Sequence, residues 1–204
     1  MTSDSKRHER IMIFLDFWNF ELSIKALDDH FLVDWKILPQ VLFTATNSHI
    51  MNPNGASFMG LRLYGSYSPS ETSLHKWGTG FLKKIPGVFP EWMPRQKQVS
   101  GPKCPVCKTE VSKCPHCTDS MLGYKEKGVD TRIATDMIKF AWEDAYDTAL
   151  LVSADQDFVP VVDFLDAKGK KVLHGRFPPK GAVLSQHCWG QIDIPPLVES
   201  FRRS

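Results

Sequence analysis

The sequence predicts an α/β protein in which a mostly parallel sheet is flanked by helices. Two short apolar runs, residues 11–15 and 148–152, lack polar alternation, which is typical of strands covered on both faces. Stretches with helical spacing of apolar residues follow these runs. The composition is that of an ordinary folded protein, since 42% of the 204 residues are hydrophobic and 24% are charged.

The first half of the chain alternates between strand and helix patterns. The strand at 11–15 ends at Asp16, and Asp34 is suited to cap the second helix. The predicted elements are a strand at 11–15, helices at 17–30 and 34–45, a strand at 58–67, a helix at 71–84 and an irregular, proline-interrupted strand at 88–99.

The second half repeats this alternation after a cysteine-rich stretch. Its predicted elements are a helix at 130–144, a strand at 148–152, a helix at 158–167, a strand at 171–173 and a helix at 181–188. We therefore expect a polar tail (1–10), one domain (11–175) interrupted by an insertion (101–118), and a C-terminal extension (176–204) packed on that domain.

Four aspartates are candidates for a site at one edge of the sheet. Asp16 and Asp155 each follow a strand, and ligands of open parallel sheets bind beyond the carboxyl ends of strands. Asp157 lies two residues further on and could join them. Asp130 begins a helix that leads back into the 148–152 strand, so it should lie at the same edge. Asp136, about 9 Å further along that helix, should not.

Clustered carboxylates repel one another unless a cation neutralises them. Oxygen ligands with room for water suit Mg²⁺ or Mn²⁺, and such an ion can activate water or neutralise charge on a phosphate. For any single aspartate the alternative is a helix N-cap, because an acid after a strand often has that role.

Three segments resemble the motifs of NYN domains, which belong to the PIN-like nuclease superfamily. They are Phe14-Leu-Asp16-Phe-Trp-Asn19, Lys127-Gly-Val-Asp130 and Ser153-Ala-Asp155-Gln-Asp157-Phe158. The resemblance spans about residues 11–174 and implies a Rossmann-like PIN fold with Mg²⁺- or Mn²⁺-dependent cleavage of RNA. It also implies that Asp16, Asp130 and Asp155 hold the metal and that Asp157 supports them. Asn19 and Ser153 would then orient the site through hydrogen bonds.

The chain departs from that family pattern directly after Asp16. Phe17 and Trp18 occupy a turn where the family usually has glycine. One of these aromatic residues is expected to pack in the core, and Trp18 could offer a surface on which a base stacks.

The insertion contains two pairs of cysteines with the spacing of a zinc site. Cys104 and Cys107 form one C-x₂-C knuckle, and Cys114 and Cys117 form a second after six residues. Four thiolates complete a closed tetrahedral shell, so the sequence predicts a structural Zn²⁺ in a small ribbon-like hairpin. The remaining cysteine, Cys188, is expected to pack in the core.

The surroundings of the insertion are basic. Residues 81–128 hold nine lysines and arginines against four acids, in a chain of net charge +2. The candidates for phosphate contacts are Lys103, Lys108, Lys113, Lys127 and Arg132. The alternative is that these lysines only keep a small loop hydrated.

Together these features predict a divalent-metal-dependent ribonuclease that cleaves RNA at internal phosphodiester bonds. A binding module that recruits RNA or protein through the zinc hairpin without cleavage is the alternative. An aspartyl phosphatase is disfavoured, because Trp18 stands where that chemistry needs a second acid. With few cysteines, no long apolar segment and only a five-residue apolar run near the start, we expect a cytoplasmic protein that does not enter membranes.

Overall fold

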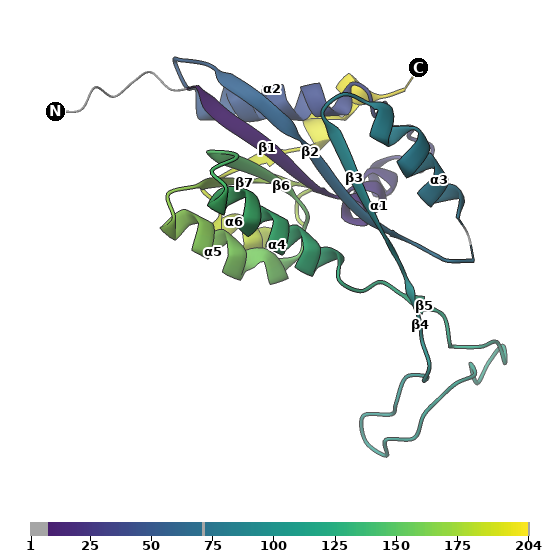
Figure 1. Ribbon diagram of the computed structural model, residues 1–204. Coiled ribbons are helices and arrows are strands. Elements are labelled where there is room, and N and C mark those ends of the chain that lie inside the picture. Colours follow the sequence, from purple (N-terminus) through teal and green to yellow (C-terminus); the bar gives the residue numbers. More distant parts are fainter. Residues whose placement is uncertain (1–7, 71, 204) are drawn as a thin grey trace.

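The computed structural model describes residues 8–70 and 72–203. Its centre is a six-stranded sheet in the order β3-β2-β1-β6-β7-β8, and every neighbouring pair runs parallel (Figure 1). The strands are β1 (Glu9–Asp16), β2 (Ala56–Tyr67), β3 (Val88–Pro94), β6 (Thr148–Val152), β7 (Lys171–Arg176) and β8 (Gly190–Asp193). The predicted α/β fold class is confirmed.

The helices cover the two faces of this sheet as separate layers. One layer contains α1 (Phe17–Leu27), α2 (Leu38–Ile50), α3 (Ser73–Gly80) and the 3₁₀ helices Leu82–Lys84 and Pro195–Phe201. The other contains α4 (Val129–Trp142), the 3₁₀ turn Gln156–Phe158, α5 (Val159–Ala167) and α6 (Ala182–His187). Each layer buries its own hydrophobic core against the sheet.

The central position of β1 in the sheet explains why its sequence is apolar without interruption. Side chains alternate between the faces of a strand, so Ile13 and Leu15 enter the core beneath α1 and α2. Met12 and Phe14 enter the opposite core beneath α4 and α5. Both faces of this central strand are covered, and a polar residue on either face would be buried without a partner.

The strand order reverses between β1 and β6, which lie side by side with Leu15 opposite Val152. From β1 the sheet continues through β2 to β3, and from β6 it continues through β7 to β8. The connections that leave β1 and β6 therefore cross to opposite faces and leave a crevice between them. Asp16 and Ser153 begin those two connections.

Two elements differ from the sequence prediction in their extent. Helix α2 begins at Leu38 and not at Asp34, because Asp34 instead closes a turn whose carboxylate accepts from Lys36 N–H at 2.9 Å. Residues 88–94 form a regular strand despite two prolines. Strand β3 is the edge of the sheet, where one side of the backbone has no neighbour and missing N–H groups are tolerated.

The C-terminal segment is part of the sheet and not only packed on it. Strand β8, which the sequence pattern did not predict, pairs in parallel with β7. The following 3₁₀ helix buries Val198 and Phe201 in the core beneath α1 and α2. None of the helices in the described ranges combines the length and apolar character that crossing a membrane requires.

The insertion leaves the domain beside the carboxyl end of β3. Strands β4 (Gln96–Lys97) and β5 (Tyr124–Lys125) form a short antiparallel ribbon at its base. Beyond this ribbon the chain extends away from the sheet, as the lower part of Figure 1 shows.

Candidate functional site

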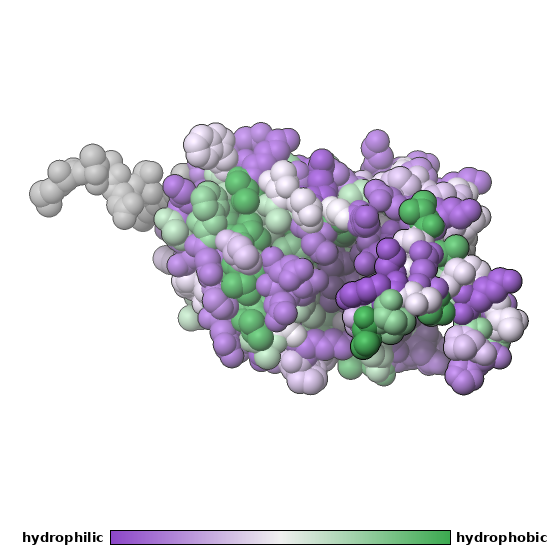
Figure 2. All heavy atoms as spheres, turned by 90° about the horizontal axis from the view of Figure 1, so that it is seen from below, coloured by the Kyte–Doolittle hydropathy of each residue, from purple (hydrophilic) through white to green (hydrophobic). Residues whose placement is uncertain are grey.

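A cavity of about 300 Å³ lies at the carboxyl ends of the central strands, where the strand order reverses. It is lined by Asp16, Trp18, Asn19, Leu22, Ser23, Glu126, Asp130, Asp155 and Lys180. The structure therefore brings three of the four candidate aspartates to one place, together with Glu126. Seen from below, hydrophilic side chains surround the recessed part of the surface behind the projecting insertion (Figure 2).

Asp16 is held rigidly at the end of β1. Its carboxylate accepts from the backbone N–H of Asn19 at 3.2 Å and from the Asn19 side-chain amide at 3.0 Å, which caps helix α1. The Ser153 hydroxyl donates to the same carboxylate at 3.3 Å. Burial raises the pKa of Asp16, and the hydrogen bonds from Asn19 and Ser153 partly offset that rise. The N-cap alternative is thus true of Asp16, but the same carboxylate also faces the cavity.

Asn19 and Ser153 connect the two sides of the crevice. The Asn19 side-chain oxygen accepts from the backbone N–H of Ala154 at 3.1 Å, which joins α1 to the loop after β6. Asp155 N–H donates to the Ser153 hydroxyl at 3.3 Å. These contacts join the end of β1 to the loop after β6, and the orienting role that the family resemblance implies for Asn19 and Ser153 stays a prediction.

Asp130 lies in the first turn of α4 and is half buried. Burial raises its pKa to about 6, and the negative charges of Asp16, Asp155, Glu126 and Asp157 add to the effect. Lys180, from the loop before α6, brings a positive charge to the cavity wall. Burial and the neighbouring carboxylates together make the ionised form of Asp130 less favourable than in a free aspartate, so a cation in this cavity would be stabilised.

The donor set fits a hard divalent cation, but the ligand shell is incomplete as the side chains lie. Within residues 8–70 and 72–203, no three Asp, Glu, His or Cys side chains form a group that could hold a metal ion. The carboxylates thus surround a shared space without converging on one point. Mg²⁺ keeps several water ligands, so it needs only one or two direct carboxylates.

Several candidate residues lie outside the cavity. Asp157 is exposed, and its backbone N–H donates to the Asp155 carboxylate at 2.9 Å, so it shapes the turn without lining the site. Arg132 does not face the cavity either, because it pairs with Glu91 and Asp136, each at 3.0 Å. Asp136 is buried on α4 and accepts from the Tyr64 hydroxyl, in agreement with its predicted displacement from the crevice.

Two charged lining residues, Glu126 and Lys180, were missed by the sequence analysis. Glu126 directly precedes the Lys127-Gly-Val-Asp130 motif. An acidic residue next to that motif was the feature of the sequence from which a place in the site could have been predicted. Lys180 follows β7 in a segment with no strand or helix pattern, so only the general rule about strand carboxyl ends pointed to it.

Of the two aromatic residues after Asp16, one packs in the core and the other lines the cavity. Phe17 is 4% exposed and packs in the core against Trp35 and Trp92. Trp18 is partly exposed and lines the cavity, with its indole N–H donating to the Ser66 carbonyl at 2.8 Å. The residue that replaces the family's usual glycine is therefore a core residue, and its neighbour is available to a ligand.

The insertion consists of two turns with the same backbone structure. Cys104 N–H donates to the Thr109 carbonyl at 2.9 Å, and Cys114 N–H donates to the Asp119 carbonyl at 2.8 Å. Lys108 and Thr118 both adopt φ 62°, and bridges Lys103–Glu110 and Lys113–Ser120 close the two turns. The cysteine pairs thus occupy equivalent positions ten residues apart.

The environments of Cys107 and Cys114 favour the thiolate. A hydrogen bond with Thr109, 3.2 Å from the sulfur, lowers the pKa of Cys107 to about 7. Backbone N–H groups of Cys117 and His116 lower the pKa of Cys114. Each knuckle is therefore suited to bind a metal, although the described residues do not bring the four sulfurs into one group.

His174, on β7, contacts the loop after β6 that carries Ser153. Its Nε2 lies 2.7 Å from the Ser153 carbonyl and its Nδ1 lies 2.7 Å from the Ser185 hydroxyl. The ring is fully buried, and burial lowers its pKa, with the charge of Arg176 acting in the same direction and that of Asp193 against it. The carbonyl contact requires a proton on Nε2, so the neutral ring accepts from Ser185.

The free energy of unfolding should therefore contain a contribution from neutral His174 that is lost under acid conditions. An unfolded histidine takes up a proton near pH 6.5, while the folded one resists it, so stability from this group is complete above that pH and falls below it. We expect the urea midpoint of the wild type to decline more than that of His174→Gln between pH 7.5 and 5.5. Asp16 and Asp130 act in the opposite sense, since their raised pKa values favour the fold as pH falls. Equal pH profiles for the two proteins would contradict this role of His174.

Comparison with known proteins identifies a family and shows similarity to solved structures. Residues 10–188 match the NYN domain family. A crystal structure of a protein of unknown function from Vibrio parahaemolyticus is similar over 100% of both chains, with 18% sequence identity and a TM-score of 0.62. That similarity supports the fold alone. No curated protein matches the chain.

Proposed function

The chain belongs to the NYN domain family, and from this premise we propose that it is a divalent-metal-dependent endoribonuclease. The family itself supports a nuclease of the PIN-like type that acts on RNA. The observation that carries the finer proposal is the cavity that Asp16, Asp130, Asp155 and Glu126 line at the switch in strand order.

In this proposal the acidic side chains would hold the divalent cation, and the reacting phosphate would bind in the same cavity. A bound Mg²⁺ or Mn²⁺ would act as a Lewis acid that activates water and neutralises charge on the phosphate. Asp16, Asp130 and Asp155 would supply the oxygen ligands. Asn19 and Ser153 keep Asp16 in place through the hydrogen bonds described above. Lys180, on the cavity wall, can bind a phosphate oxygen of the RNA.

The direct test is cleavage of a panel of labelled RNAs by the purified protein. We expect internal cuts with Mn²⁺ or Mg²⁺ and none with EDTA. Products analysed on a denaturing gel distinguish internal cleavage from stepwise removal of end nucleotides. Binding of RNA without cleavage under every metal condition would contradict the proposal and favour the binding-module alternative.

We further propose that the two cysteine knuckles share one structural Zn²⁺. The support comes from the two spacings, the equivalent turns and the lowered thiol pKa values of Cys107 and Cys114. Lys103, Lys108 and Lys113 alternate with these cysteines, and with Lys127 they would contact RNA phosphates without choosing a sequence.

Protein purified without chelators should contain about one zinc per chain, as four thiolates form one closed site. Elemental analysis should show that Cys104→Ser removes most of this zinc. The matched control is Cys188→Ser, because burial raises the pKa of Cys188 to about 12 and disfavours its thiolate. A zinc content equal in Cys104→Ser and the wild type would exclude this site.

A further inference from the structure

A second cavity, of about 480 Å³, adjoins the acid cavity. Both cavities are lined by Trp18, which begins α1 directly after Asp16. The walls of the second cavity come from α1, the end of β2, α3 and the residue that follows β3. It therefore lies at the same edge of the sheet as the acids. Its volume falls within the range of about 300–1,000 Å³ that is typical of small-ligand sites.

Aromatic rings and a guanidinium dominate this second cavity. Trp18, Tyr67 and Trp77 line this cavity and are each only partly buried. His75 stacks on the Tyr67 ring with 4.4 Å between the ring centres, which leaves the other face of Tyr67 for a base. Arg95 lies with its guanidinium carbon 5.0 Å from the centre of the Trp18 ring. The same side chain approaches Glu126 of the acid cavity to 4.0 Å. Arg95 thus bridges the aromatic cavity and the acids.

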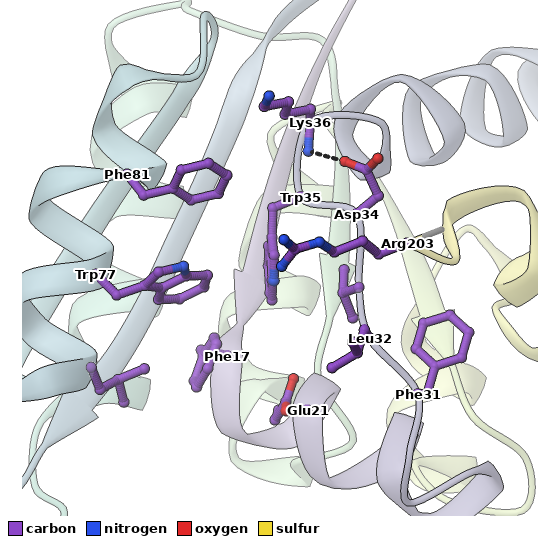
Figure 3. Close-up of a pocket in the computed structure, with 12 residues that line it drawn as sticks. Phe17, Glu21, Phe31, Leu32, Asp34, Trp35, Lys36, Trp77, Phe81 and Arg203 are labelled. Atoms are coloured by element: carbon purple, nitrogen blue, oxygen red, sulfur yellow. Dashed lines mark hydrogen bonds between the residues drawn. The ribbon is translucent and has the colours of Figure 1, made fainter.

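The aromatic lining continues into a third cavity, of about 580 Å³. The second and third cavities share four lining residues, Phe17, Glu21, Leu74 and Trp77. Figure 3 shows Trp77 on α3, and Phe81 directly after that helix, facing Trp35, with the guanidinium of Arg203 beside the Trp35 ring. We call the two cavities together the aromatic groove.

The aromatic groove contains acidic and basic side chains, but its acids have partners within the protein, whereas an arginine lies at each end. Glu21 is 3.2 Å from Lys25, which leaves that acid paired. Asp34 accepts from its own turn, at the backbone N–H of Lys36. Arg95 at one end and Arg203 at the other are cations that can contact a phosphate backbone while the rings face the bases.

We propose that the aromatic groove binds unpaired nucleobases of the RNA strand whose phosphate lies in the acid cavity. This inference rests on the proposed function and adds to it a binding site for the flanking nucleotides. A base in a stacked helix presents only its edges, whereas an unpaired base can insert its face between aromatic rings. The groove would therefore select single-stranded segments, and it would do so through Tyr67, Trp77 and Arg95, none of which lines the acid cavity.

The test is equilibrium binding without cleavage. Fluorescence anisotropy would follow a short fluorescein-labelled single-stranded RNA, with the Asp155→Asn protein in EDTA as the common background. We expect Tyr67→Ala to weaken binding about tenfold, since one base loses its stacking surface. Tyr67→Phe should restore most of the affinity, because the ring is retained. A duplex of the same sequence should bind more weakly and should not respond to Tyr67→Ala.

An RNA series with one abasic position identifies the base concerned. In the protein that retains Tyr67, one abasic position should weaken RNA binding. In Tyr67→Ala, the same abasic position should lower the affinity little further, because the stacking partner of that base is already absent. The matched control is Trp142→Ala, which removes an aromatic ring that is 85% exposed on α4, on the opposite face of the sheet. Its affinity should equal that of the background protein.

The outcomes separate this inference from the nuclease proposal. If wild-type protein cuts no RNA but the Tyr67 series behaves as expected, the groove stands and the nuclease proposal falls. If wild-type protein cuts RNA while Tyr67→Ala and the abasic series leave affinity unchanged, the groove is overturned and the nuclease stands.

Discussion

Asp155→Asn should lower the rate of metal-dependent RNA cleavage about 10²–10³-fold while the fold stays intact. The substitution removes one negative charge from the cavity, and ligands that stabilise a metal-assisted transition state contribute several kcal/mol. Asparagine keeps the side-chain oxygen that accepts from Asp157 N–H at 2.9 Å, so the turn after β6 is preserved. Asp16→Asn is a poorer choice, because its amide would face the donors of Asn19 and Ser153.

The measurement is the initial rate at increasing Mn²⁺ concentration, with circular dichroism to verify the fold. Asp157→Asn is the matched control, since its carboxylate is exposed and does not line the cavity. We expect only a small change from it, because loss of the Asp157 charge lowers the pKa of Asp130 and leaves Asp130 more fully ionised. Full activity of Asp155→Asn, or equal losses in both variants, would contradict the proposed role of Asp155.

Phe201→Ala should reduce the free energy of unfolding by about 3–5 kcal/mol, the usual cost of removing a buried phenylalanine ring. Phe201 is fully buried, and its ring centre lies 6.1 Å from that of Phe20 and 5.9 Å from that of Phe31. The loss is a large fraction of the stability of an ordinary domain. It would show that the last turn of the chain completes the core beneath α1.

Urea denaturation followed by circular dichroism measures this change. Trp142→Ala again serves as the control, because its exposed ring should alter the free energy of unfolding by no more than about 0.5 kcal/mol. A Phe201→Ala protein as stable as this control would mean that the C-terminal turn is dispensable for the fold.

The strands that the sequence predicted correctly are those with the strongest physical signal. Strands β1 and β6 are buried on both faces, so burial alone requires them to be apolar throughout. Strand β8 is an edge strand of four residues, Gly-Gln-Ile-Asp, with one buried side chain. So short a segment has no detectable periodicity, and its pairing with β7 depends on the rest of the fold.

The candidate site likewise contains some residues that the sequence could predict and others that it could not. Asp16, Asp130 and Asp155 could be proposed together because each follows or begins a recognisable element, and parallel strands bring such positions to one edge. Glu126 and Lys180 come from segments without regular structure, where no periodicity relates sequence position to place. Tyr67, Trp77 and Arg95 of the aromatic groove are separated by up to 28 positions and meet only in the folded chain.

By itself, the sequence determined the α/β class, the central strands, the acids at their ends and the two cysteine knuckles, because each depends on spacing within one short segment. The tertiary structure alone decided that β8 completes the sheet, that Arg132 pairs away from the acids and that an aromatic groove adjoins them. These features require contacts between distant segments, whose geometry is set by how the helices pack on the sheet and not by any local pattern.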